Sequence, residues 1–88
     1  MKVLKNQRDK IVDYMLTGAR INRPYCAQNC IALELSSRIG EIQEEYGIEI
    51  QRKSIKFGNS RVTEYWIKPD DMEFVRNQFM INVWRDEE

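Results

Sequence analysis

The chain has 88 residues, enough for one domain but with only a thin margin of buried surface. Apolar residues make up 42% and charged residues 32%, which is the composition of a folded domain and not of a disordered chain. No run approaches the roughly 18 apolar residues of a membrane helix, and the first ten residues lack the apolar core of a secretory signal. We therefore expect a cytoplasmic protein with no membrane association.

The sequence contains no histidine, which excludes Ser-His-Asp triads, Cys–His nucleophiles and His-ligated zinc. Its two cysteines, Cys26 and Cys30, have a spacing that differs from a CxxC knuckle, and we favour burial for both. The four glycines stand apart from one another, so the sequence has no glycine-rich phosphate loop. We therefore predict a binding protein and not an enzyme, with no cofactor, metal or small-molecule substrate.

The net charge is zero, but its distribution along the chain is uneven. Residues 1–28 carry six basic and two acidic side chains, and residues 48–68 carry five basic and two acidic ones. Residues 29–47 carry one basic and four acidic side chains, and residues 69–88 carry two basic and six acidic ones. A zero total argues against indiscriminate nucleic-acid binding, but it is compatible with a local basic face.

Two helices are expected in the first 30 residues. The first covers residues 6–16, with Asn6 as its N-cap, Asp9 in its first turn and Gly18 at the left-handed position that follows it. The second is short and begins near Pro24, which suits a first turn. Asn22 is its best capping side chain, and we expect it to end near residue 29 or 30.

The third helix is the clearest of the chain. Its apolar residues repeat at intervals of 3, 4, 3 and 4, and they should face the core: Ala32, Leu35, Ile39, Ile42 and Tyr46. Gly47 ends this helix. Gly40 lies on its other side, where a glycine costs about 1 kcal/mol relative to alanine and is unusual unless something must approach closely.

The hydrophobic period then changes from that of a helix to that of a strand. We predict strands over residues 48–53 and 62–67, joined through a turn at residues 58–60, with Tyr65 and Ile67 on the inner face. A last helix is predicted over residues 70–83, capped by Asp70 or Asp71. Its buried stripe is expected to contain Met72, Val75, Phe79 and Val83, while Phe74, Met80, Ile81 and Trp84 lie off that stripe.

This order of elements predicts a mostly α-helical fold with a small β-hairpin, a winged helix-turn-helix with an extra C-terminal helix. In that fold the third helix enters the DNA major groove, and the hairpin, or wing, lies along the backbone or in the minor groove. We expect residues 1–68 to form this domain. Residues 69–88 are expected to form a C-terminal helix and an acidic tail, which would serve as a dimerisation element.

The sequence also resembles the small helix-turn-helix domain family that is common in bacteriophages and prophages. The segments that carry this resemblance are Gln7-Arg8-Asp9-Lys10-Ile11, Thr17-Gly18, Ile21-Asn22-Arg23-Pro24, Leu35-Ser36-Ser37-Arg38-Ile39 with Ile42, and Arg61-Val62-Thr63-Glu64-Tyr65-Trp66-Ile67. The chain departs from the family pattern at Arg23, where Ser or Thr is usual, and at Gly40, where a bulkier residue is usual. The resemblance implies DNA binding in the cytoplasm of a bacterial host, as a transcriptional regulator or an excisionase-like factor.

Three groups of residues are candidates for contact with double-stranded DNA. They come from the start of the second helix, from the outer face of the third helix and from the wing: Arg23, Tyr25 and Gln28; Leu33, Ser36, Ser37, Arg38 and Gly40; and Lys53, Lys56, Asn59 and Arg61. For each group the alternative is an ordinary solvated surface. Arg38 either reaches DNA or pairs along the helix, where Glu34 at i−4 has a better orientation than Glu41 at i+3.

The acidic half of the third helix is the strongest objection to DNA binding. Glu41, Glu44 and Glu45 would repel phosphates unless they lie at the end of the helix away from the DNA. The alternative function is a protein-binding winged helix, such as a phage inhibitor of a host protein. The surplus of apolar residues on the last helix favours a homodimer over a monomer in either case.

Overall fold

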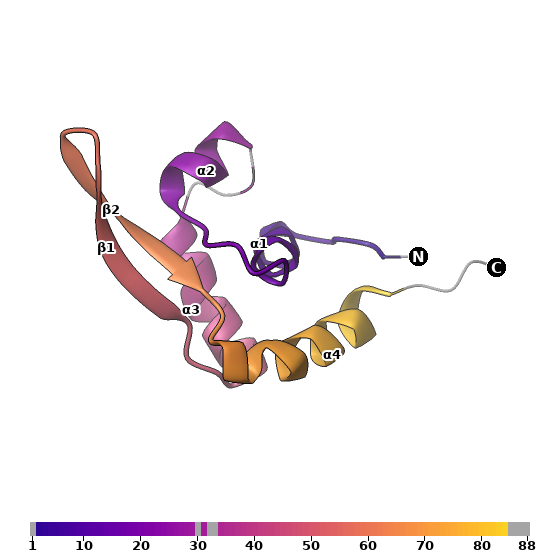
Figure 1. Cartoon of the computed structure of the whole chain (residues 1–88). Coiled ribbons are helices and arrows are strands. Elements are labelled where there is room, and N and C mark those ends of the chain that lie inside the picture. The colour runs from indigo at the N-terminus through magenta and orange to yellow at the C-terminus, as the bar shows by residue number, and fades with distance from the viewer. Residues whose placement is uncertain (1, 30, 32–33, 85–88) are drawn as a thin grey trace.

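Three helices, a hairpin and a fourth helix follow one another in the computed structural model, which describes residues 2–29, 31 and 34–84. The elements are α1 (Gln7–Met15), α2 (Arg23–Gln28), α3 (Leu35–Tyr46), β1 (Gln51–Phe57), β2 (Ser60–Trp66), the 3-10 helix η1 (Pro69–Asp71) and α4 (Met72–Val83). This is the topology of a winged helix-turn-helix with one additional helix, as the sequence predicts. In Figure 1 the hairpin lies on the left, α1 and α2 lie to its right, and α4 lies below.

The predicted N-caps of the first two helices are confirmed. Asn6 Oδ1 accepts a hydrogen bond from the Asp9 backbone N–H at 2.9 Å, and Asn22 Oδ1 accepts one from Tyr25 N–H at 2.8 Å. Each amide thereby satisfies a backbone donor that has no partner within its own helix. The second cap holds Arg23 at the first position of α2, at the surface of the protein.

The buried face of α3 follows the predicted stripe. Its buried residues are Leu35, Ile39, Ile42 and Tyr46, and the helix ends at Gly47 with a φ of 64°. A left-handed residue at this position is the usual way to end a helix, and glycine adopts it without a steric cost. Ala32, which the sequence places on the same stripe, lies outside the described residues.

The two strands of the wing pair in an antiparallel register that runs from Gln51↔Trp66 to Phe57↔Ser60. Because residues directly opposite one another point to the same side, the register separates the side chains of the wing into two faces. One face, here called the inner face, carries the pairs Arg52↔Tyr65, Ser54↔Thr63 and Lys56↔Arg61.

Two contacts fix the base of the wing against the helices. Ile21, in the segment between α1 and α2, exchanges two backbone hydrogen bonds of 2.9 Å with Tyr65. Gln43 on α3 accepts hydrogen bonds through Oε1 from Ile50 N–H at 3.0 Å and from Arg52 Nη2 at 3.2 Å. The base of the wing is thereby held beside the start of α2 and the C-terminal half of α3.

The fourth helix completes the hydrophobic core. Val75, Phe79 and Val83 are fully buried in one cluster with residues of α1 and α3 such as Ile11 and Ile39. Tyr65 and Ile67 are buried in the same cluster, as predicted. No helix within the described residues is long and apolar enough to cross a membrane.

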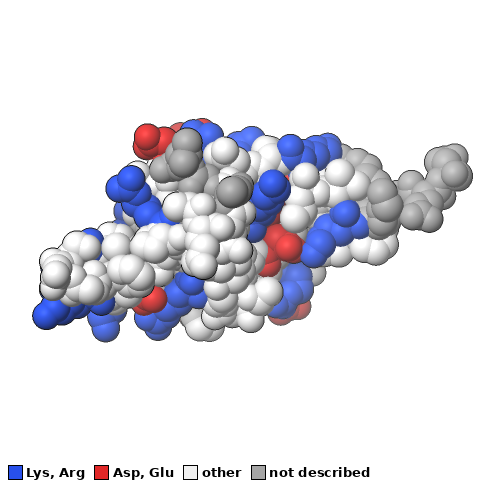
Figure 2. Space-filling view, turned by 90° about the horizontal axis from the view of Figure 1, so that it is seen from above, with Lys and Arg blue, Asp and Glu red and all other residues white. Residues whose placement is uncertain are grey.

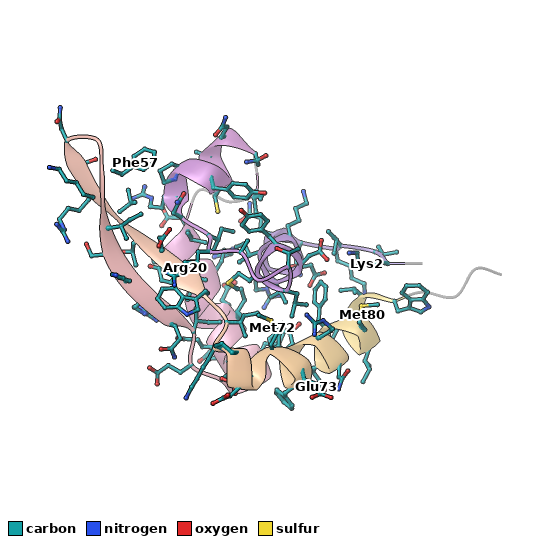
Figure 3. All side chains as sticks on the ribbon, in the orientation of Figure 1. Lys2, Arg20, Phe57, Met72, Glu73 and Met80 are labelled. Atoms are coloured by element: carbon teal, nitrogen blue, oxygen red, sulfur yellow. The ribbon has the colours of Figure 1, made fainter. Side chains whose placement is uncertain are left out.

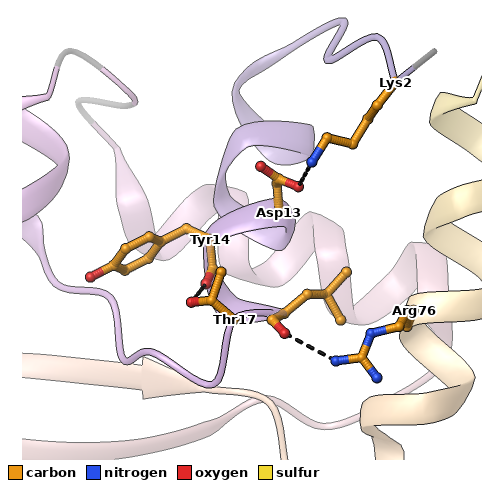
Figure 4. A network of polar contacts seen from close by, with 6 residues as sticks. Lys2, Asp13, Tyr14, Thr17 and Arg76 are labelled. Carbon is orange, nitrogen blue, oxygen red and sulfur yellow. Dashed lines mark hydrogen bonds and ion pairs between the residues drawn. The ribbon is translucent and has the colours of Figure 1, made fainter.

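Polar contacts join α4 and the N-terminal segment to α1 (Figure 4). Arg76 Nη2 donates a hydrogen bond of 3.1 Å to the carbonyl oxygen of Leu16, just beyond the C-terminus of α1. Lys2 Nζ lies 2.6 Å from Asp13 Oδ1, and Val3 N–H donates to the carbonyl oxygen of Val83 at 2.7 Å. Burial raises the pKa of Tyr46 on α3, against the opposing effect of a hydrogen bond with Asn82 of α4.

Several predicted boundaries are wrong by one to four residues. The strands were expected at 48–53 and 62–67, but the ladder covers Gln51–Phe57 and Ser60–Trp66 because pairing continues up to the turn at Gly58 and Asn59. The last helix begins at Met72, since Pro69 starts a 3-10 turn, and Asp71 precedes it without a capping side-chain bond. Gly18 is left-handed with a φ of 89°, but it lies two residues beyond the C-cap of α1.

Candidate nucleic-acid interface

A cleft of about 280 Å³ brings together three of the regions that the sequence identifies. Arg23 reaches it from the start of α2, Ser36 from the first turn of α3, and Arg61 from the wing. The remaining lining residues are Val62, Thr63 and Tyr65 of β2. Among the described residues that line this cleft none is acidic, and we call it the basic cleft.

At the outer edge of the basic cleft, Arg61 is directly opposed by a second cation that does not itself line the cleft. Lys56 and Arg61 are cross-strand partners at the last pair but one before the turn, and both side chains are exposed. Like charges placed directly opposite each other destabilise a strand pair. Arg61 Nε donates a hydrogen bond of 3.1 Å to Ser54 Oγ, a neutral partner on the same face of the wing. An anion bound between the two cations would remove this repulsion.

The outer stripe of α3 carries small residues in its first half. Successive residues of a helix are rotated by 100° about its axis, which places Ser37, Gly40 and Glu44 opposite the buried stripe. Ser36 lies on the side of α3 that faces the wing. Ser36 and Ser37 are exposed. A Cβ added to Gly40 would meet no heavy atom of the described residues within 4 Å. The first half of α3 therefore offers a neutral surface on which another molecule can come close to the backbone.

Arg38 pairs with Glu41 and not with Glu34, which corrects the preference expected from helix geometry. Arg38 Nε lies 3.2 Å from Glu41 Oε1, and Arg8 Nε of α1 lies 3.6 Å from the same oxygen. Glu34 precedes α3 at its N-cap position with a non-helical φ of −114°, so the regular i−4 geometry does not apply to it. Glu41 is thereby neutralised by two arginines on the α1 side of α3.

The acidic residues of α3 are distributed over both of its ends. Glu44 and Glu45 are exposed in the last turns. Glu44 lies eight residue steps after Ser36, which places it about 12 Å further along the helix axis. Glu34 is exposed directly before the N-terminal end of α3, two positions before Ser36. Figure 2 shows basic side chains at several places along one face, including the end of the wing, separated by uncharged residues and by fewer acidic ones. On this face the cations form separate groups and no continuous stripe.

The other candidate residues occupy different environments. Tyr25 is half-buried and its ring stacks on Tyr14, with ring centroids 4.2 Å apart, while desolvation and the neighbouring Tyr14 raise its pKa. Gln28 is exposed near the end of α2, and Asn59 is exposed in the turn of the wing. Lys53 pairs across the ladder with Glu64, on the face of the wing opposite the basic cleft. Leu33 lies outside the described residues.

Cys26 is completely buried, as the sequence predicts, and burial raises the pKa of its thiol. This cysteine therefore belongs to the core and not to a surface site. Cys30 lies outside the described residues. Burial is thus confirmed for one of the two cysteines.

Phe57 was not singled out from the sequence. It is 51% exposed at the last residue of β1, directly before the turn, and Figure 3 shows it near the free end of the wing. Its exposure follows from the hairpin register, in which it opposes Ser60 beyond the reach of the core. The only signal in the sequence was an aromatic residue next to a Gly-Asn turn.

Arg20, which the sequence places near the start of the second helix with Arg23, does not join it at the basic cleft. Its guanidinium lies 4.1 Å from the centroid of the Trp66 ring, and its Nη1 lies 3.4 Å from Glu64 Oε1. These contacts occupy Arg20 on the face of the wing opposite the basic cleft. Trp66 thus packs against Arg20 within the protein.

Comparisons with known proteins add no assignment to this geometry. No family model matches the chain, and neither the curated proteins nor the solved structures include a match. The resemblance to phage proteins therefore stays a prediction. The features that bear on the function are the fold and the basic cleft.

Proposed function

We propose that this protein binds double-stranded DNA through the basic cleft and the first half of α3. In this proposal Arg23, Lys56 and Arg61 contact backbone phosphates, and Ser36, Ser37 and Gly40 approach the base edges in the major groove. The protein would act without catalysis, as a transcriptional regulator or an excisionase-like factor of phage or prophage type.

The observation that carries the proposal is the meeting of three separate chain segments at one cleft. Arg23 and Arg61 are 38 positions apart in the sequence, and both line the cleft with Ser36 between them in chain order. The Lys56↔Arg61 pair at its outer edge is electrostatically unfavourable within the isolated wing. Both features have a common explanation if a polyanion occupies this surface.

The positions of the acidic residues are compatible with this docking. Glu41 is held by Arg8 and Arg38 on the α1 side of α3, away from the wing side that Ser36 occupies. Glu44 and Glu45 lie at the far end of the helix. Glu34 is the acid nearest to the proposed contact, and it should limit affinity for DNA of any sequence.

The salt dependence of binding to a labelled duplex tests the proposal. We expect log affinity to fall linearly with log salt, with a slope that corresponds to roughly 3 to 6 phosphates per protomer. Fluorescence anisotropy over a series of salt concentrations measures this slope. Binding that does not change with salt would contradict the proposal. The absence of binding at physiological salt, together with a stoichiometric complex with a host protein, would favour the protein-binding alternative.

A further inference from the structure

The outward side of α4 exposes large apolar side chains, although the helix already fills the core with its opposite face. Five large apolar side chains are exposed among the described residues, and four of them belong to α4 or its C-cap: Phe74, Met80, Ile81 and Trp84. Phe74 is 53% exposed and Ile81 is 72% exposed. Figure 3 shows Met72 on the side of α4 that is turned to the body and Glu73 on the outer side.

The exposed side chains follow a regular pattern. Phe74, Asn77, Gln78 and Ile81 have the spacing i, i+3, i+4, i+7, so they form one stripe along α4, here called the α4 outer stripe. At 100° per residue this stripe lies opposite Val75, Phe79 and Val83. All four of its side chains are exposed. The monomer therefore leaves two large apolar side chains of this stripe, Phe74 and Ile81, exposed with two amides between them, while Met80 and Trp84 lie off the stripe.

The α4 outer stripe is complementary to itself. In an antiparallel pair of α4 helices related by a two-fold axis between Asn77 and Gln78, Phe74 of each copy faces Ile81 of the other. The two amides then face each other at the centre, where they can exchange hydrogen bonds and fix the register. The stripe carries no charged residue, so the pairing brings no like charges together.

We propose that the protein forms an antiparallel homodimer through the α4 outer stripe. The proposal does not depend on DNA binding. A membrane surface fits this helix less well, because interfacial helices carry Lys and Arg beside the apolar face, whereas the charges within α4 are Glu73 and Arg76 and the latter is bonded to Leu16. A helix of 12 residues is about 18 Å long. Its contact area is small beside the roughly 800 Å² per partner of stable interfaces, so the dimer should be weak and dissociate on dilution.

Charge substitutions test the pairing. Because the stripe is exposed, Phe74→Lys and Ile81→Glu should leave the fold intact by circular dichroism, and each should weaken dimerisation at least 10-fold. An equimolar mixture of the two variants should restore a dimer, since one Lys–Glu pair and one Phe–Ile pair would form. Phe57→Lys is the matched control, because Phe57 is 51% exposed but lies on the wing.

Sedimentation equilibrium over a range of protein concentrations measures these states. The wild-type chain is expected to pass from 10.6 kDa towards twice that mass as its concentration rises. A wild-type protein that stays monomeric at several hundred micromolar would overturn the proposal. So would dimerisation that resists both α4 substitutions, a mixture that stays monomeric, or an equal loss in Phe57→Lys. None of these outcomes bears on the salt dependence of DNA binding.

Discussion

Replacement of both Lys56 and Arg61 by alanine is expected to weaken binding to duplex DNA by roughly 30-fold at physiological salt, since each lost phosphate contact costs about 5-fold there. The loss should be similar for all DNA sequences, because in the proposed docking these residues contact phosphates and not bases. The slope of log affinity against log salt should become shallower by about 1.8, which corresponds to two phosphates. Fluorescence anisotropy with duplexes of different sequence measures both quantities.

The matched control for this double variant removes two cations that lie away from the basic cleft. Lys53 opposes Glu64 on the other face of the wing, and Lys68 is exposed before η1. The double substitution Lys53→Ala, Lys68→Ala changes the net charge by the same amount and should weaken binding by less than about 3-fold, because it removes no phosphate contact. Equal losses in the two double variants would mean that only total charge matters. The basic cleft would then have no special role.

Phe79→Ala should destabilise the protein by about 3–5 kcal/mol, the usual cost of removing a buried phenylalanine side chain. Phe79 is 1% exposed and joins α4 to the core formed with α1 and α3. Since a domain of this size has a total stability of about 5–10 kcal/mol, most of the stability would be lost. Urea denaturation followed by circular dichroism measures the change in the free energy of unfolding.

Phe74→Ala provides a control with the same change of side chain in the same helix. Phe74 is 53% exposed in the monomer, so its replacement should change the free energy of unfolding by no more than about 0.5 kcal/mol. Both variants should be compared at low micromolar concentration, where dimerisation contributes little. A similar loss in the two variants would show that α4 does not pack through the stripe of Val75, Phe79 and Val83.

Local chemistry made much of the fold predictable. The caps at Asn6 and Asn22, the end of α3 at Gly47 and the Gly-Asn turn depend on a few neighbouring residues, and all are as expected. The period of the last helix also predicted which of its side chains stay exposed. These features do not depend on how distant segments meet.

The arrangement of the candidate site was harder to predict from the sequence, because it depends on strand register and on long-range contacts. A shift of one residue in the register exchanges the two faces of a strand. The register therefore decides that Arg61 shares the face of Lys56. Lys53 and Lys56, three residues apart in one strand, must point to opposite faces, but the predicted strand ended at residue 53 and left Lys56 outside it. The pairing of Ile21 with Tyr65, which brings α2 beside the wing, has no local signal either.

The central claim is that DNA binds at the basic cleft, and mapping amide chemical shifts on the ¹⁵N-labelled protein during titration with a duplex tests it most directly. The largest changes are expected at Arg23, Ser36, Ser37 and Arg61, with little change in the last turn of α3. Changes concentrated at Glu44 and Glu45, or no changes at physiological salt, would contradict the claim.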